Sequence, residues 1–211
     1  LLLTSSFDLY NNRQELIFKV KISYRINGDG SMQVEVLADP TDKPEYLAKT
    51  GMQFRLPGSL SEIEWYGMGP HETYPDRQSS GRVDVYRKTV DELWEDYIVP
   101  QENGNRSQIR RVSISNDQGY GLRFSGPEPM NFSAYRYSDA SITEAKHTWQ
   151  LEKDDYITFN FDYRQSGLGT ATCGPGCQPA YLLPAQKTSF SFTISPVQPE
   201  KKTRRRKRRK R

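Results

Sequence analysis

The sequence is poor in cysteine and has no long apolar run. Only 2 of its 211 residues are Cys, which excludes a disulfide-dense scaffold. No apolar stretch reaches the length of about 18 residues that a membrane helix needs, and the mean hydropathy is −0.82, so no membrane partner is expected. Aromatic residues make up 12% of the chain, too many for a disordered protein. A chain of this size can bury a core of its own.

Basic charge is confined to the C-terminal end. The segment Lys201–Arg211 holds 10 basic residues, and without it the net charge falls from +4 to −6. A nucleic-acid-binding domain is expected to carry its basic patch on the fold, so no nucleic-acid partner is expected. We interpret residues 199–211 as a disordered basic tail, which could be an arm, a localisation signal or a cloning remnant.

The N-terminal end does not have the pattern of a signal peptide. Leu1-Leu2-Leu3 has no basic segment before it and no long apolar segment after it. The sequence therefore reads as a piece of a longer polypeptide, and its cellular location stays open.

Hydrophobic residues in the body alternate with a period of two. In Leu16–Ile26 every second side chain is apolar, which predicts a half-buried strand. A turn at Asn27–Gly30 joins it to a second alternating run, so the two form a predicted hairpin. In Tyr156–Tyr163 we expect Phe159, Phe161 and Tyr163 on one face and Thr158, Asn160 and Asp162 on the other. The further predicted strands are Met32–Ala38, Met52–Leu56, Glu62–Tyr66, Val83–Tyr86, Ile109–Ser115, Tyr120–Phe124, Met130–Tyr135 and Ser189–Ile194.

Helices play a small part in the predicted fold. Thr89–Glu92 and Ser141–Glu144 both match the capping-box pattern that begins a helix. Many strands and few helices predict an all-β fold, a large antiparallel β-sandwich with short helices that occupies residues 1–198 as one domain.

The residues that could bind a metal lack the spacing of a known site. His71 and His147 lie far apart, and Cys173 and Cys177 are separated by three residues, which fits neither a zinc knuckle nor a thioredoxin-type site. We therefore expect no metal site in this chain. Carboxylates are numerous, but we expect most of them at solvent-facing positions, and the sequence does not show which two could meet as the acid and nucleophile of a glycosidase.

Two segments could contact carbohydrate. Gln165–Leu183 is a long Gly- and Pro-containing loop between two strands, where sandwich proteins often place recognition residues. Trp65, Tyr66, His71 and Tyr74 form an aromatic group that could pack on a sugar, although for Trp65 a place in the core is the favoured interpretation.

Four blocks of sequence resemble the C-terminal domain of the large bacterial β-galactosidases. The first runs from Trp65 to Arg77 and resembles the pattern W-x-G-x-G-P-x-E-x-Y-P-D-R. The other blocks follow in the family's order, and the likeness covers roughly residues 16–195: Tyr97–Gly104, Phe132–His147 and Gln165–Gly169. The motif residues, for which we expect a structural role, are Trp65, Gly69, Pro70, Glu72, Tyr74, Pro75, Asp76, Arg77, Glu102, Asn103 and Gly104.

The resemblance implies a galactose-mutarotase-like sandwich that lacks the first strands of the family's domain. It also implies that the two catalytic glutamates of a retaining β-galactosidase, and the Mg²⁺ and Na⁺ near the sugar, belong to a barrel domain absent from this chain. This chain would then hold no catalytic residue, bind no cofactor itself, and pack on the other domains of a parent enzyme. The parent would act on β-galactosides, and its expected partners include further copies of itself in a homo-oligomer.

The family's aglycone loop has a counterpart that departs from its pattern. In many members the loop reads G-x-x-S-W-x-P, and its Trp stacks on the aglycone. The matching positions here are Thr172, Cys173, Gly174 and Pro175, with Cys173 in the place of the aromatic ring. The resemblance thus implies a wider acceptor subsite. The alternative function is a free-standing carbohydrate-binding module.

Overall fold

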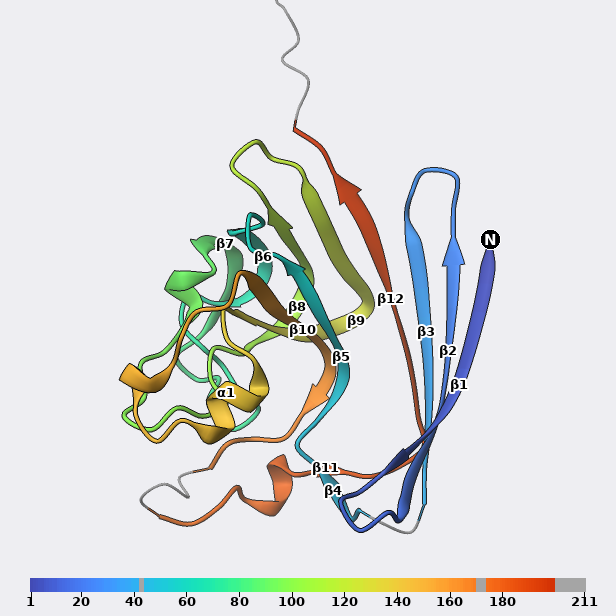
Figure 1. The fold of residues 1–211 in the computed structure, drawn as a ribbon, viewed down its shortest axis with the longest axis vertical. Helices are drawn as coiled ribbons and strands as arrows, with labels where there is room; N and C mark the ends of the chain where they lie inside the picture. Colours follow the sequence, from blue (N-terminus) through green and yellow to red (C-terminus); the bar gives the residue numbers. More distant parts are fainter. Residues whose placement is uncertain (42–43, 170–173, 200–211) are drawn as a thin grey trace, which may run out of the picture.

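The computed structural model describes residues 1–41, 44–169 and 174–199 and shows an antiparallel β protein (Figure 1). Within those residues it has one α-helix, α1 (Asp139–Glu144), and three short 3-10 turns, η1 (Asp91–Leu93), η2 (Thr148–Gln150) and η3 (Pro179–Tyr181). The strands are β1 (Leu2–Tyr10), β2 (Leu16–Ile26), β3 (Met32–Pro40), β4 (Tyr46–Leu47), β5 (Lys49–Pro57), β6 (Glu62–Gly69), β7 (Arg82–Thr89), β8 (Arg106–Ser115), β9 (Gly121–Tyr135), β10 (Tyr156–Gln165), β11 (Leu183–Pro184) and β12 (Thr188–Val197). The predicted all-β class is confirmed.

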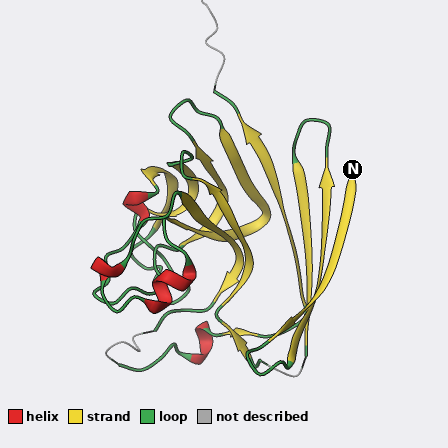
Figure 2. Ribbon diagram, viewed as in Figure 1, coloured by secondary structure: helices red, strands yellow, loops and turns green. Residues whose placement is uncertain are grey.

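Ten strands form one continuous sheet that folds over itself. Eight follow the order β1-β2-β3-β12-β9-β8-β6-β7, while β10 pairs with both β9 and β5. The long strand β9 joins the two layers, because residues 121–125 pair with β12 and residues 131–135 pair with β10. Figure 2 shows the helical turns on the side of the molecule away from β1–β3.

The core lies where β5 and β10 pack on β9 and β12. Phe54 of β5 lies 5.3 Å from Phe124 and 6.3 Å from Phe192 between ring centroids. Phe159 and Phe161 are fully buried on this face, and Tyr163 stacks on Phe190 at 5.2 Å. The predicted apolar face of β10 is therefore confirmed.

Strand β9 corrects a prediction of two strands. The sequence predicted Tyr120–Phe124 and Met130–Tyr135 as separate strands, because Pro127 and Pro129 lie between them. In the structure residues 126–129 have no ladder partner, since β9 leaves β12 before it pairs with β10. Proline lacks a backbone N–H and is tolerated where no ladder bond is needed.

The starts of the two predicted helices also differ from the structure, and one strand was missed. Thr89 and Glu92 make both capping-box hydrogen bonds, but the helix at this place is the single turn η1, which contains Glu92. Helix α1 begins at Asp139 with Ser138 as its N-cap, so Ser141 is not the cap that the sequence predicted. Strand β1 was not predicted at all.

No helix in the described part of the chain has the length and hydrophobicity to cross a membrane. The predicted tail lies outside the described residues from position 200 onward.

Candidate functional site

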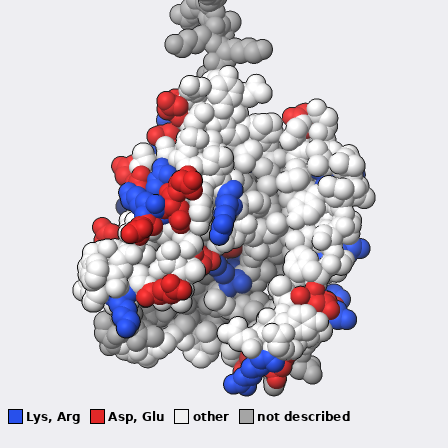
Figure 3. All heavy atoms as spheres, in the orientation of Figure 1, with Lys and Arg blue, Asp and Glu red and all other residues white. Residues whose placement is uncertain are grey.

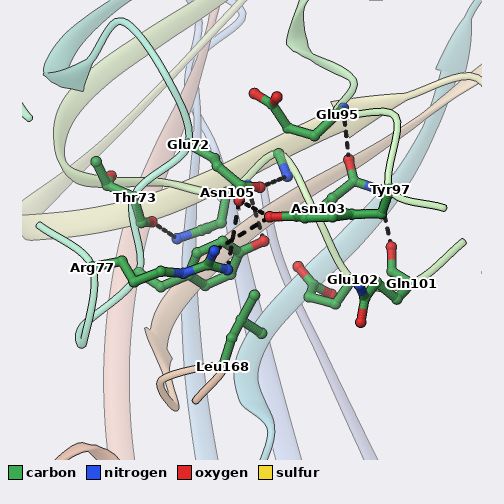
Figure 4. A network of polar contacts seen from close by, with 12 residues as sticks. Glu72, Thr73, Arg77, Glu95, Tyr97, Gln101, Glu102, Asn103, Asn105 and Leu168 are labelled. Carbon is green, nitrogen blue, oxygen red and sulfur yellow. Dashed lines mark hydrogen bonds and ion pairs between the residues drawn. The ribbon is translucent and has the colours of Figure 1, made fainter. Parts of the chain in front are cut away.

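The loop after β6 carries a carboxylate at the centre of a polar network. Glu72 accepts hydrogen bonds from the Tyr97 hydroxyl and from the Gly104 N–H, the latter at 2.8 Å. Its Oε1 lies 3.5 Å from Arg77 Nη2. Burial and the Glu72 carboxylate raise the pKa of Tyr97, so its hydroxyl remains a donor at neutral pH. Figure 4 shows these side chains converging from two loops, which Glu72 holds together.

Asp76 connects the same loop to the chain that leaves β10. Its carboxylate oxygens accept hydrogen bonds from Leu168 N at 3.1 Å and Gly169 N at 2.7 Å. Gly169 has a φ of +66°, a conformation that favours glycine. Asp76 therefore fixes the backbone just before residues 170–173, which are predicted to belong to the aglycone loop.

A buried arginine supports the loop after η1. Arg106 is fully buried and donates from Nη1 to the carbonyls of Leu93 at 2.9 Å and Gly104 at 2.6 Å. Burial lowers the pKa of Arg106, and Glu95 opposes this shift. Its guanidinium lies 5.8 Å from the ring of Trp65, which is itself fully buried. Trp65 is thus a core residue, as the favoured interpretation predicted.

The motif residues make their contacts within the chain. A hydrogen bond joins the loops that contain Thr73 and Asn105: Asn105 Nδ2 donates to the Thr73 carbonyl at 2.8 Å. Tyr74 is buried, and Asn103 links Glu95 to Gln101 through hydrogen bonds of 3.3 and 2.9 Å. Gly69 and Pro70 share a cis peptide bond at the end of β6, and Pro75 lies between Tyr74 and Asp76. These contacts lie within the chain, and the structural role of the motif stays a prediction.

The predicted aglycone loop is described only in part. Thr172 and Cys173 lie outside the described residues, whereas Gly174 and Pro175 are exposed. Cys177 is a free thiol. His71 contacts the Ser80 hydroxyl at 2.8 Å, and His147 stacks on Trp149. Among the described residues no group of three His, Cys, Asp or Glu could hold a metal ion.

A second polar group, which the sequence analysis missed, covers one whole face of three strands. The face of β10 opposite the core carries Thr158, Asn160 and Asp162, and all three are buried. Their partners on the neighbouring strands are polar residues or glycine: Asn131, Ser133 and Tyr135 on β9, and Gly51, Gln53 and Arg55 on β5. Beyond them, Lys49 of β5 pairs with Gln165 at the end of β10. We call this surface the polar face. Alternation had separated the two faces of β10 correctly, but it did not reveal that both are buried.

Hydrogen bonds run across the polar face from strand to strand. Asn160 Nδ2 donates to Ser133 Oγ and Tyr135 Oη, both at 3.0 Å. Gln53 Nε2 donates to Asn160 Oδ1 at 3.0 Å and to Asp139 Oδ2 at 2.8 Å. Asp139, at the start of α1, also accepts from Tyr135 at 3.0 Å, so the helix covers one end of the face.

Charged groups occupy the other end of the polar face. Lys49 Nζ lies 3.4 Å from Glu102 Oε2. Burial lowers the pKa of Lys49, but Asp162, Glu102 and Asp139 outweigh it and raise the value overall. Burial raises the pKa of Asp162 to about 7, while Lys49 opposes the shift. This end of the face therefore holds one cation, Lys49, with the carboxylates of Asp162 and Glu102, while Asp139 acts on Lys49 from the end that α1 covers.

The fold and the two polar groups define an antiparallel sandwich whose loops are fixed by internal polar contacts. A family model described as "Beta galactosidase small chain" matches residues 3–194. The chain belongs to this family.

Curated relatives agree with that assignment. A β-galactosidase of Actinobacillus pleuropneumoniae is 32% identical over 179 residues, covering 84% of this chain and 17% of the relative. One of Vibrio cholerae is 31% identical over 184 residues, covering 87% and 17%. A GalM/aldose epimerase homologue from C. elegans is 11% identical with a TM-score of 0.48, covering 92% of this chain and 65% of that structure. The chain thus spans about a sixth of the length of these curated relatives.

Proposed function

We propose that this chain is the C-terminal, non-catalytic domain of a β-galactosidase that hydrolyses terminal β-D-galactosides with retention. The observation that carries the proposal is the family match over residues 3–194 together with relatives that bear this name. Because the chain spans only 17% of their length, the parent has ample room for a barrel with the two catalytic glutamates and the Mg²⁺ and Na⁺ sites.

An apolar groove supports packing of the domain against other parts of that parent. The groove has a volume of about 490 Å³ and lies between the β1–β3 side of the sheet and β5. Phe7, Leu9 and Met52 line it, and Phe7 and Leu9 are exposed. Among the described residues β5 pairs with β10 alone, so its other edge is open. The remaining domains of the polypeptide would cover this surface.

The contact with the substrate would come from the loop whose base Asp76 holds. Hydrogen bonds that Leu168 N and Gly169 N donate to Asp76 fix the backbone directly before this loop. Within this loop Cys173 would face the aglycone, where a thiol offers less stacking surface than an indole.

Activity measurements on the chain and on the parent test the proposal separately. The purified chain should show no turnover of an aryl β-galactoside above background, because it lacks the paired glutamates. Turnover that one carboxylate substitution abolishes would contradict the non-catalytic role.

Cys173→Trp in the intact enzyme should restore an aromatic platform. Stacking worth about 0.5–1.5 kcal/mol changes affinity by several-fold to about tenfold. The comparison of kcat/KM for two galactosides that differ only in the aglycone measures this effect. Equal changes for both substrates would contradict the role of the loop.

A further inference from the structure

An exposed patch of arginines and apolar side chains covers the outer face of β6, β7 and β8. In this face Tyr66 of β6 pairs with Val85 of β7 and with Arg111 of β8. Tyr66 is 38% exposed, and Val83 and Val85 are each 44% exposed. Exposed apolar groups surrounded by tyrosine and arginine are typical of protein–protein interfaces. We call this group the arginine patch, and its members are Tyr66, Val83, Val85, Arg87, Arg110 and Arg111.

The backbone of β8 is distorted where it brings two arginines beside Tyr66. The register of β8 shifts between Ile109 and Arg111, and Gln108 has a φ of +57°, a conformation that is strained outside glycine. The guanidinium carbons of Arg110 and Arg111 lie 5.3 and 5.8 Å from the ring centroid of Tyr66. Bulges re-aim side chains and occur often next to functional sites. The bulge in β8 therefore points to a function for the two adjacent arginines.

The arginine patch has more positive charge than its own carboxylate can neutralise. Glu64 Oε2 lies 2.6 Å from Arg87 Nη2, and Glu64 Oε1 lies 3.7 Å from Arg111 Nη1. Arg110 is exposed and donates from Nη1 to the Gln108 carbonyl at 2.7 Å, but it forms no ion pair with the described residues. Because three arginines share one glutamate, the patch attracts an acidic partner.

An acidic segment with exposed apolar side chains adjoins the patch along the chain. It runs from Asp91 to Val99 and begins directly after the end of β7. Ile98 and Val99 are 87% and 49% exposed. Glu92 and Asp96 are exposed as well, and within the part of the chain that the structure describes neither carboxylate has an ion-pair partner. Figure 3 shows acidic and basic groups side by side on the left of the view, where Figure 1 places β7 and the helical turns.

The patch and the acidic segment are complementary to each other, not to themselves. Contact between two arginine patches would bring arginine beside arginine, which like-charge repulsion disfavours. Contact between a patch and an acidic segment joins opposite charges and covers apolar groups on both sides. Since each molecule carries both surfaces, a two-fold axis between two molecules would form this contact twice and close the assembly.

We propose that two copies of this chain form a symmetric dimer in which the arginine patch of each binds the acidic segment of the other. Asp96 of one copy pairs with Arg110 of the other, and Ile98 covers the exposed ring of Tyr66. The contact involves neither the apolar groove nor the aglycone loop. The dimer can therefore fail without affecting the proposed β-galactosidase role, and an inactive parent leaves the dimer intact.

Sedimentation velocity of the full chain over a range of concentrations tests the proposal. The wild type should show a reversible monomer–dimer equilibrium that salt weakens. Arg110→Glu and Asp96→Arg should each weaken association by about tenfold or more, because like charges then meet across the interface. An equimolar mixture of these two variants should associate again, since the heterodimer has one native pair and one reversed pair. Arg25→Glu, which reverses an exposed charge on β2, is the matched control and should associate as the wild type does.

Several results would overturn the dimer. A wild type that stays monomeric at all concentrations would leave the patch to a different partner. A mixture of the two variants that associates no better than each alone would exclude the pairing of Asp96 with Arg110. Loss of association with Asp96→Arg but not with Arg110→Glu would identify the basic residues 201–211 as the partner of the acidic segment. Ile98→Ser changes a side chain that is 87% exposed, so it should keep the fold, and unchanged association of this variant would also contradict the interface.

Discussion

Replacement of Asp162 by Asn should stabilise the protein at neutral and alkaline pH. Asp162 is 3% exposed, and burial is the main reason that its pKa rises from 3.8 to about 7. Glu102 and Asp139 raise it further, while Lys49 lowers it. Asn keeps the shape of the side chain but cannot ionise, so it avoids the cost of a buried charge.

The sign and size of the effect follow from proton linkage. Asp162 ionises near pH 3.8 in the unfolded chain and near pH 7 in the folded protein. Between these values the folded state binds more protons, so the free energy of unfolding falls as the pH rises. The stability associated with this group is fully present below about pH 4 and is lost by about pH 7. One pKa unit is worth about 1.4 kcal/mol, so the full effect is about 4 kcal/mol.

Urea denaturation of both proteins at several pH values measures this difference. The variant and the wild type should be nearly equal at pH 4, and the variant should be more stable by about 2–4 kcal/mol at pH 8. The lowered pKa values of Asp29, Asp91 and Glu92 act in both proteins and cancel in the comparison. A variant less stable than the wild type at pH 8 would refute the reasoning, because the ionised Asp162 beside Lys49 would then be net stabilising.

Two further substitutions test the backbone around the two polar groups. Asp76→Asn can keep at most one of the two hydrogen bonds that Asp76 accepts from backbone N–H groups. We therefore expect the free energy of unfolding to fall by about 1–3 kcal/mol and the Tm to fall by about 2–10 °C. Asp84→Asn on the exposed part of β7 is the control, and equal melting temperatures of the two variants would contradict the role of Asp76. Gly51→Ala should destabilise the chain more than Gly28→Ala in urea denaturation, because a Cβ at Gly51 lies 2.4 Å from the Asp162 Cα whereas nothing lies within 4 Å at Gly28. Equal stabilities of the two alanine variants would show that β10 moves away at little cost.

Most of the strands that the sequence predicted have a buried face, although β7 was predicted and has no buried residue. Alternation in Leu16–Ile26 exists because Phe18, Val20 and Ile22 face the core, and such local patterns can be read from one segment alone. Strand β1 escaped prediction because all nine of its residues are exposed, so no burial imposes a period on it. Strand β9 was divided in two because the choice of its partners depends on distant segments.

The site was predictable only where a family resemblance named its residues. The motif drew attention to Glu72 and Asp76, but their bonds to Gly104 and Gly169 join segments that lie far apart in the sequence. The burial of the polar face was missed for a different reason. A polar residue at every second position of a strand normally marks the solvent side, and only the coverage by α1 and by the loop bearing Glu102 buries it.

The polar face contains groups that lower the stability of the fold at neutral pH. Most of its members are satisfied internally, as in the chain of bonds from Gln53 through Asn160 to Tyr135. The Gln165 Oε1 is buried without a partner, and a buried unsatisfied group costs about 1–3 kcal/mol. Burial of the Asp162 carboxylate adds a further cost at neutral pH.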